Sequence, residues 1–371
     1  MTYQCCTRCV MDNASDNQIS FDSSGVCNYC KYALSRKPNE YFPNKEGEKK
    51  LDELVSLLKE NGKNKDFDCL MGLSGGLDSS YLAYLGSKLG LRILAFHIDD
   101  GFNTPTAESN LKKLCEKAKI NLIVETPDKI QFADVTKAFF LADLRGLCIP
   151  QDNLIFSYLY KNAHKYGITN FLSGKNFHAE SILQRGGGHN ASDGKHIRAI
   201  SSLFGNKATD KLEIMNLFYS YVLSRYKHKI TNYKLLNFID YNNKNAIKEL
   251  NEYCGFEYYG GKHRESYLTH YAMSVYSPEK FNYDVRRSHL SSLVIAGEIT
   301  RDEALEELRK PPCDPETREY LINIMLESFQ MNREDYERIM SRPPKSHTDY
   351  PHSALIKLAP IARKFRNYLN P

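Results

Sequence analysis

The sequence predicts an α/β protein in which a parallel sheet is flanked by helices, with a small cysteine-rich segment before it and a helical region after it. Short apolar runs alternate with helical stretches between residues 67 and 173, a spacing typical of parallel βαβ units. Five of the ten cysteines fall within the first 30 residues, and the strand signal ends near residue 206. We therefore expect three domains: a zinc ribbon over 1–35, a nucleotide domain over 36–205 and a helical substrate or partner region over 206–371.

The individual elements follow from hydrophobic pattern and from helix-terminal residues. A charged connector and one amphipathic helix occupy 36–66. Strands are expected at four apolar runs and helices between them, because each run is bounded by turn residues. The expected strands are 67–73, 92–98, 121–124 and 169–173, and the expected helices are 78–89, 105–118 and 151–166.

The C-terminal region carries three helix-start signals. Thr300 and Glu303 form the capping-box pattern, in which each side chain binds the other residue's backbone N–H group. Asp314 precedes a first-turn proline, and Asn332 can cap a third helix. A basic amphipathic helix is predicted over 353–369. Its apolar face could pack on its own domain, on a partner protein or on a membrane surface.

Composition excludes several classes of protein. The chain has 371 residues, 42% of them hydrophobic, and 50 basic residues against 45 acidic ones. A net charge of +5 without clustering gives nucleic acid little reason to bind. No apolar run approaches the roughly 18–20 residues that span a bilayer, and the N-terminus lacks the apolar core of a signal peptide. We expect a cytoplasmic protein with no membrane span.

The N-terminal cysteines have the spacing of a metal site. Cys6-x2-Cys9 is followed after seventeen residues by Cys27-x2-Cys30, which matches a four-thiolate zinc ribbon. So short a segment buries too little apolar area to fold alone, so the metal would supply folding energy. We interpret the site as structural zinc. An iron–sulfur cluster would use the same ligands, and unrelated surface thiols are the alternative.

A glycine-rich loop between the first strand and the next helix predicts a phosphate site. Two glycines let several N–H groups face one phosphate cluster, serine hydroxyls add donors, and the helix contributes its positive end. Asp78 is expected to hold Mg²⁺ on the pyrophosphate, and the missing Gly-Lys-Ser/Thr argues against a Walker loop. The loop residues expected to bind the nucleotide are Ser74, Gly75, Gly76, Asp78, Ser79 and Ser80.

The run SGGLDSS resembles the loop of the PP-loop ATP pyrophosphatase superfamily, whose fold is adenine nucleotide α-hydrolase-like. The resemblance implies that ATP is split into AMP and pyrophosphate while a substrate oxygen is adenylated. It places His97 and Asp99, after the second strand, and Gly174, after the fourth, at the nucleotide. Lys175 and Glu180 are expected to face phosphate and metal respectively, which with Ser74 and Asp78 gives the expected catalytic set.

Three further stretches resemble the N-acetyl sugar amidotransferases of bacterial surface-polysaccharide biosynthesis. They are CTRCVMD…GVCNYC near the N-terminus, YGGKHRES at 259–266, and KFNYDVRRSHLSS at 280–292 with AGEITRDEAL following. The resemblance implies conversion of an acetamido group into an acetamidino group in O-antigen or lipopolysaccharide biosynthesis. At Lys175 the sequence departs from the family, where an acidic residue is expected.

Charged residues in these stretches are candidates for binding a nucleotide-activated N-acetyl sugar, since guanidinium groups match phosphate oxygens. Solvated surface charge is the alternative. The candidates are Lys262, His263, Glu265, Arg286 and Arg287. Twelve of the 25 tyrosines lie within 219–283, where an aromatic core is favoured over a stacking wall for sugar and base.

The nitrogen source is expected outside this chain. The phosphate loop begins at residue 74, which leaves no room before it for a glutaminase domain, and residue 2 is threonine rather than a nucleophilic cysteine. The resemblance implies a separate glutaminase subunit, with a cyclase-like channel partner.

Two other functions compete with the amidotransferase. One is a tRNA-thiolating or tRNA-amidating enzyme with Cys148 as a sulfur carrier. From residue 206 onward the chain has 25 basic and 22 acidic residues, which gives RNA little electrostatic reason to bind. Cys148 itself is interpreted as a structural, buried cysteine. The other is a non-catalytic zinc-ribbon scaffold, against which the intact loop argues. The sequence does not specify the sugar, the amide, the nucleotide carrier or the oligomeric state.

Overall fold

The computed structural model describes residues 2–186, 188–227 and 229–358. At its centre is a five-stranded sheet of order β3-β2-β1-β4-β5 in which every neighbouring pair is parallel. The predicted parallel sheet flanked by helices is therefore confirmed. The strands are β1 (Cys69–Gly72), β2 (Ile93–Ile98), β3 (Asn121–Glu125), β4 (Asn170–Leu172) and β5 (Thr231–Tyr233).

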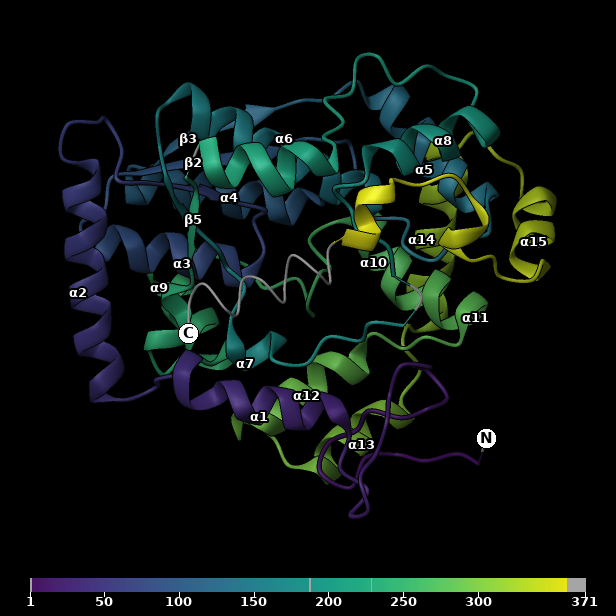
Figure 1. The fold of residues 1–371 in the computed structure, drawn as a ribbon, viewed down its shortest axis with the longest axis horizontal. Helices are drawn as coiled ribbons and strands as arrows, with labels where there is room; N and C mark the ends of the chain where they lie inside the picture. Colours follow the sequence, from purple (N-terminus) through teal and green to yellow (C-terminus); the bar gives the residue numbers. More distant parts are fainter. Residues whose placement is uncertain (1, 187, 228, 359–371) are drawn as a thin grey trace.

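Helices connect and cover these strands (Figure 1). The first eight are α1 (Asn28–Glu40), α2 (Lys45–Gly62), α3 (Leu77–Lys88), α4 (Pro105–Ala118), α5 (Lys129–Leu141), α6 (Ile149–Lys165), α7 (Phe177–Glu180) and α8 (Gly194–Phe204). The remaining α-helices are α9 (Asn243–Cys254), α10 (Tyr267–Tyr271), α11 (Ser277–Phe281), α12 (Arg286–Ala296), α13 (Arg301–Arg309), α14 (Pro315–Ser328) and α15 (Arg333–Ser341). The caps predicted at Thr300, Asp314 and Asn332 are confirmed at the starts of α13, α14 and α15.

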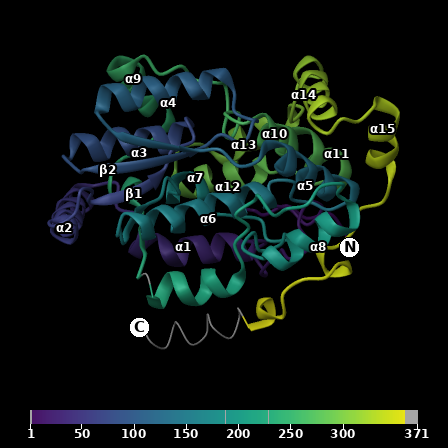
Figure 2. The same cartoon turned by 90° about the horizontal axis from the view of Figure 1, so that it is seen from above.

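The core lies on both faces of the sheet because successive strand residues point to opposite sides. Met71 joins the apolar cluster formed with α2, α3, α4 and α9, whereas Leu70 joins the cluster formed with α5, α6 and α8. Figure 2 shows α3, α4 and α9 on one side of β1 and β2 and α6 on the other. The phosphate loop leaves the carboxyl end of β1, the middle strand, so it opens at the centre of the fold.

Two expectations about secondary structure are wrong. Strand signal does not end near residue 206, since β5 pairs with β4 as an edge strand; its Thr-Asn-Tyr sequence is short and mostly exposed, so no apolar run announces it. The segment after the cysteines is not a loose connector, because α1 runs from Asn28 to Glu40 and crosses the boundary expected at residue 35. Its first turn is begun by the second cysteine pair, as Cys27 accepts a hydrogen bond from the backbone of Cys30.

The end of the chain is described only in part. The amphipathic helix expected over 353–369 falls largely outside the described residues, which include a short 3-10 helix, η5 (Ala354–Leu358), at its beginning. Within the described ranges, no helix combines the length and apolar character needed to cross a membrane.

Candidate functional site

The phosphate loop folds back on itself between β1 and α3. Gly75 has φ of +78°, and a Cβ atom there would lie 2.3 Å from the carbonyl oxygen of Ala107, so only glycine fits. The Ser74 hydroxyl accepts a hydrogen bond from the Gly76 N–H (3.1 Å) and lies 3.1 Å from the Ser79 hydroxyl. Gly76 is the N-cap of α3 and offers no side chain to its first turn, so that helix end faces the hollow of the loop.

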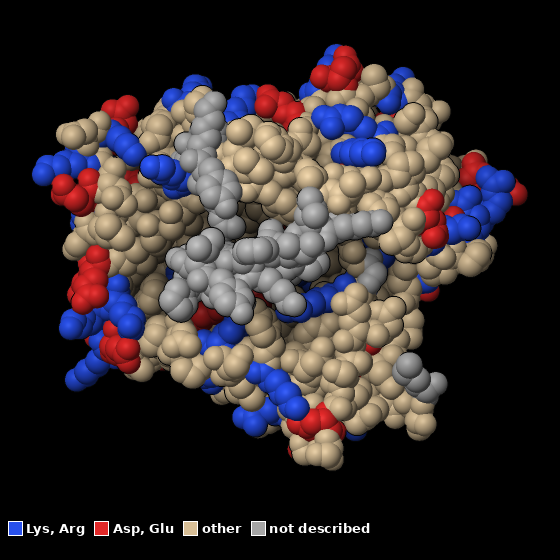
Figure 3. Space-filling model, viewed as in Figure 1, with Lys and Arg blue, Asp and Glu red and all other residues tan. Residues whose placement is uncertain are grey.

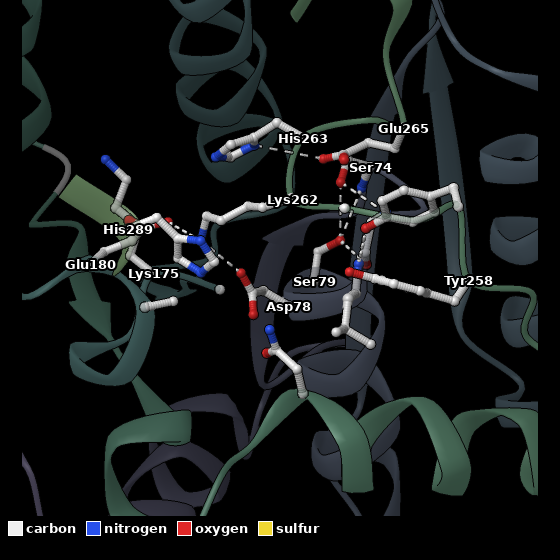
Figure 4. A pocket seen from close by; sticks show the side chains of 17 residues that line it. Ser74, Asp78, Ser79, Lys175, Glu180, Tyr258, Lys262, His263, Glu265 and His289 are labelled. Atoms are coloured by element: carbon white, nitrogen blue, oxygen red, sulfur yellow. Dashed lines mark hydrogen bonds and ion pairs between the residues drawn. The ribbon is translucent and has the colours of Figure 1, made fainter. Parts of the chain in front are cut away.

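A second loop, residues 258–265, closes over the first and forms a pocket with it. The pocket has a volume of about 240 Å³. Tyr259 fixes the two loops together, since its hydroxyl accepts a hydrogen bond of 2.6 Å from the backbone N–H of Leu77. Figure 4 shows side chains from both loops, and from residues 174–180 after β4, pointing into the same space. Of the sequence-predicted residues, those that line it are Ser74, Gly76, Asp78, Ser79, Gly174, Lys175, Glu180, Lys262, His263 and Glu265.

Two carboxylates converge on one ammonium group in this pocket. The Lys262 Nζ lies 3.1 Å from Asp78 Oδ2 and 2.9 Å from Glu180 Oε1. The Tyr241 hydroxyl donates a hydrogen bond of 2.5 Å to the other Asp78 oxygen. Burial raises the pKa of Asp78, but Lys262 and the Tyr241 hydrogen bond outweigh it and hold the pKa below its ordinary value. Asp78 is therefore an anion at neutral pH.

Three polar atoms at the pocket are buried without a hydrogen-bond partner among the described residues. They are Asn243 Oδ1, Glu265 Oε2 and His289 Nε2. His263 adds a strained backbone, with φ of +64°, next to Glu265. Burial, reinforced by Lys262, lowers the pKa of both histidines, to about 3 for His289. Unsatisfied polar atoms and backbone strain gather at binding sites, where a ligand can satisfy the polar atoms.

Other sequence-predicted residues support the loop from outside the pocket. The His97 Nδ1 atom lies 2.9 Å from the carbonyl oxygen of Leu73, and its Nε2 lies 3.1 Å from the Asn103 side chain, which positions the end of β1. Asp99 forms an ion pair of 2.8 Å with Lys129. Ser80 is fully buried inside α3.

Arg286 and Arg287, expected to bind the sugar, do not line the pocket. Arg286 pairs with Asp284 (2.7 Å) and donates to the carbonyl of Lys310 at the end of α13. Arg287 pairs with the buried Asp12 (2.8 Å) and donates to the Val10 carbonyl. Arg286 thus joins the start of α12 to the end of α13, and Arg287 joins α12 to the N-terminal segment.

Sequence reasoning assigned no site role to Tyr241, which donates a hydrogen bond to Asp78, or to four polar residues that line the pocket: Asn243, Tyr258, Tyr259 and His289. Nothing in the local pattern distinguishes Tyr241 from Tyr271 and Tyr276, which are buried in the core, whereas Tyr259 begins one of the family-like stretches. The tyrosine-rich region thus supplies both core residues and pocket residues, and only the tertiary structure shows which tyrosine is which. His289 lies inside one of the family-like stretches, which was the available signal.

The four predicted zinc ligands form a closed, buried cluster. Cys6, Cys9, Cys27 and Cys30 are fully buried, and their sulfur atoms lie within 4.8 Å of one another. The Cys6–Cys30 and Cys9–Cys27 sulfur distances are 3.9 and 3.8 Å. Thiolates bound to one zinc at about 2.3 Å lie about 3.8 Å apart in a tetrahedron, so the cluster fits structural zinc. Cys5 lies outside it, 3.8 Å from Arg301.

The fold and the loop can be compared with what the loop sequence implied. A central β1 in a parallel sheet of this order, followed by SGGLDSS and the N-terminus of α3, agrees with the fold that the resemblance to PP-loop ATP pyrophosphatases implies. The predicted parallel sheet and the position of the loop in it are thus confirmed.

Comparison with family models gives a match for part of the C-terminal region. Residues 265–363 match the model described as LPS biosynthesis protein WbpG-like, C-terminal domain. The resemblance to a surface-polysaccharide biosynthesis family is thereby confirmed over this segment, which includes His289 and α12 to α15.

Solved structures give a broader likeness. An NH3-dependent NAD synthetase from Campylobacter jejuni subsp. jejuni NCTC 11168 is 19% identical, with 80% of this chain and 97% of that chain covered and a TM-score of 0.30. An NMN synthetase from Francisella tularensis is 16% identical, with 78% and 98% covered and a TM-score of 0.34. Likeness at these TM-scores carries no further argument. The search of curated proteins gives no match.

Proposed function

We propose that this protein is an ATP-dependent amidotransferase, a carbon–nitrogen ligase that converts the N-acetyl group of a nucleotide-activated sugar into an acetamidino group for lipopolysaccharide biosynthesis. The observation that carries the proposal is the pocket itself. The phosphate loop and the 258–265 loop, which lies in a family-like stretch, meet there around Asp78, Glu180 and Lys262.

The phosphate loop would hold the triphosphate of ATP. The uncapped start of α3 and the hydroxyls of Ser74 and Ser79 present donors on one side of the pocket. Lys175, exposed at the pocket's opposite side, and Lys262 bring two positive charges toward it. Preorganised donors of this kind stabilise the charge that develops as pyrophosphate leaves.

Asp78 and Glu180 would hold Mg²⁺. Their oxygens converge on a single cation, the Lys262 ammonium, so the pocket already accommodates a positive charge between them. Oxygen donors of this type suit magnesium. When bound, the metal would neutralise charge on the pyrophosphate leaving group, while Lys262 balances the two carboxylates in its absence.

The chemistry proceeds in two balanced steps. The acetamido oxygen attacks the α-phosphorus of ATP, pyrophosphate leaves, and an adenylated imidate forms. Ammonia then attacks the activated carbon, the C–O bond breaks, and AMP departs with the original amide oxygen. The His263 imidazole, which lines the pocket, would accept the proton that ammonia releases. The unpartnered Glu265 and His289 atoms are available to the sugar.

Ammonia would reach this site from another protein. A separate glutaminase subunit, with a cyclase-like partner forming the channel, would supply it. The purified chain should then use ammonium directly and use glutamine only when the glutaminase is added.

The tRNA-thiolating alternative finds less support. Burial raises the pKa of the Cys148 thiol to about 12, which disfavours the thiolate that sulfur transfer needs. Its sulfur contacts only the Thr269 hydroxyl, at 3.9 Å, among the contacts described. Figure 3 shows basic and acidic side chains interspersed over the described part of one face rather than a continuous basic surface.

The test is a product assay on the purified full-length protein. It is incubated with ATP, Mg²⁺, ammonium and a panel of UDP-linked and other nucleotide-activated N-acetyl sugars. Mass spectrometry should detect a sugar in which C=NH replaces C=O, formed together with equal amounts of AMP and pyrophosphate. ADP and phosphate as products, or thiolation of added tRNA, would contradict the proposal.

A further inference from the structure

Three histidines form a second cluster, outside the pocket. His189 precedes α8, His196 lies in its first turn, and His347 begins the short 3-10 helix η4 (His347–Asp349). Each offers one ring nitrogen, and these nitrogens lie within 4.8 Å of one another. His196 is fully buried, His347 is 6% exposed and the side chain of His189 is 8% exposed. The cluster thus joins segments about 150 residues apart in sequence.

One nitrogen of each ring is held by an oxygen acceptor. His196 Nδ1 lies 3.0 Å from the Pro351 carbonyl oxygen, and His347 Nε2 lies 2.7 Å from that of Arg145. His189 Nε2 lies 3.0 Å from a carboxylate oxygen of Asp193. Because these oxygens accept hydrogen bonds, each of the three nitrogens must carry the proton and donate it.

This assignment leaves two lone pairs facing each other. With its proton on Nδ1, a neutral His196 has an unprotonated Nε2; with its proton on Nε2, a neutral His347 has an unprotonated Nδ1. These two atoms lie 3.0 Å apart. Neither can donate to the other, so as neutral rings they repel unless a cation lies between or beside them.

The outer hydrogen bonds match the support that metal-binding histidines have in proteins. A ligating histidine donates its other N–H to a carboxylate or a backbone carbonyl, which fixes the tautomer and the ring orientation. Nitrogens bound to one zinc at about 2.0–2.1 Å lie about 3.3 Å apart in a tetrahedron, close to the observed separation. Asp193 reinforces the arrangement, because it also accepts hydrogen bonds from the backbone of His196 and Ser353.

We propose that His189, His196 and His347 bind a divalent transition metal, with zinc the favoured ion, as a second metal site separate from the four cysteines. His196 would use Nε2, His347 Nδ1 and His189 Nδ1. His352 lies further away, with its ring centre 6.1 Å from that of His189, and is outside the cluster of three. The buried ligands make this a structural metal that fastens residues 347–352 to α8.

Zinc content and ligand type test the proposal. The full-length protein, prepared without a histidine tag, is loaded with zinc and gel-filtered before elemental analysis. The wild type should hold about two zinc ions per chain, one for each site. His347→Gln and His196→Gln should each hold about one, and the exposed His164→Gln control should keep about two.

X-ray absorption at the zinc edge of the wild type makes the test independent of how the variants fold. Mixed sulfur and nitrogen ligands are expected, and the nitrogen contribution should vanish in folded His347→Gln. A wild-type protein that retains one zinc with sulfur ligands only would overturn the proposal. A proton shared between His196 and His347 would then explain their close ring nitrogens. Two zinc ions in both cluster variants would overturn it equally.

Discussion

Asp78 is the residue on which the charges of the pocket converge, through Lys262 and Tyr241. Asp78→Asn keeps the shape of the side chain and removes its charge. We expect kcat to fall by about 10²-fold or more, because a preorganised electrostatic contact to the reacting phosphates is lost. The measurement is pyrophosphate release at saturating ATP.

The matched control for this change is Asp52→Asn, which removes a charge from the exposed side of α2. It should leave kcat unchanged. Retention of normal pyrophosphate release by Asp78→Asn would show that the loop aspartate does not serve the reaction.

His289 makes a prediction about pH. Burial lowers its pKa from 6.5 to about 3, so between these values the unfolded chain binds a proton that the folded chain does not. The neutral ring therefore stabilises the folded protein fully above pH 6.5, and this stability is lost as the pH falls. The free energy of unfolding decreases by at most about 1.4 kcal/mol per pH unit. The ring is only half-buried, so solvent reduces this figure.

His289→Gln should therefore lose less unfolding free energy than the wild type between about pH 7 and about pH 5, by roughly 1 kcal/mol. Urea unfolding at the two pH values gives the comparison, with the exposed His164→Gln as control. An identical loss in wild type and His289→Gln would mean that the histidine is protonated inside the folded protein.

Among the elements, the phosphate loop depends on the backbone of Gly75. Gly75→Ala brings a left-handed backbone penalty and places a Cβ 2.3 Å from the Ala107 carbonyl oxygen. Gly167→Ala has a similar φ of +61° with nothing within 4 Å of the added carbon, so it isolates the backbone penalty of about 1 kcal/mol. Gly75→Ala should cost at least about 1–3 kcal/mol more and abolish ATP binding, measured by urea unfolding and calorimetric titration. Equal costs for the two variants would contradict the loop geometry.

The contact between the cysteine segment and α12 depends on Arg287 and Asp12. Arg287→Ala leaves the carboxylate of Asp12, which is 2% exposed, without its ion pair. We expect a loss of about 2–4 kcal/mol in unfolding free energy and no change in the sugar KM. Arg318→Ala, which breaks the half-exposed pair with Glu279, should cost less than about 1 kcal/mol. A raised sugar KM with normal stability in Arg287→Ala would return this residue to the binding site.

The elements that the sequence predicts are those whose signal is local. The strands β1 to β4, the capped helices α13 to α15 and the cysteine pairs each carry their own pattern of apolar, capping or ligand residues. The strand β5 is too short and polar to stand out, and it is specified by its partner β4. The role of Arg287 was equally invisible, because Asp12 lies 275 positions away in the chain and only folding brings the two together.

At the scale of the whole molecule, the pocket is assembled from distant parts of the chain. Residues 74–79 and 174–180 follow β1 and β4, whereas residues 258–265 and His289 come from the helical region. Motif reading found the first group because a phosphate loop has a recognisable sequence, and the resemblance it raised led to the second group after β4. It found the 258–265 loop only through family resemblance, since no spacing rule places Lys262 beside Asp78.

Under the proposed function, this assembly would couple ATP chemistry to sugar binding. The carboxylates and the phosphate loop lie on the sheet, and the segment that matches WbpG-like proteins begins at Glu265, on the pocket wall. The central claim is that the oxygen of a sugar acetamido group attacks ATP within this pocket. Labelling that oxygen tests the claim most directly.

The measurement uses a nucleotide-activated N-acetyl sugar whose acetamido carbonyl carries heavy oxygen, incubated with ATP, Mg²⁺, ammonium and the purified chain. Mass spectrometry of the nucleotide product should find the label in AMP, with pyrophosphate unlabelled and the amidino sugar free of it. Label that remains in the sugar, or that appears in phosphate, would contradict adenylation of the amide oxygen and with it the proposed reaction.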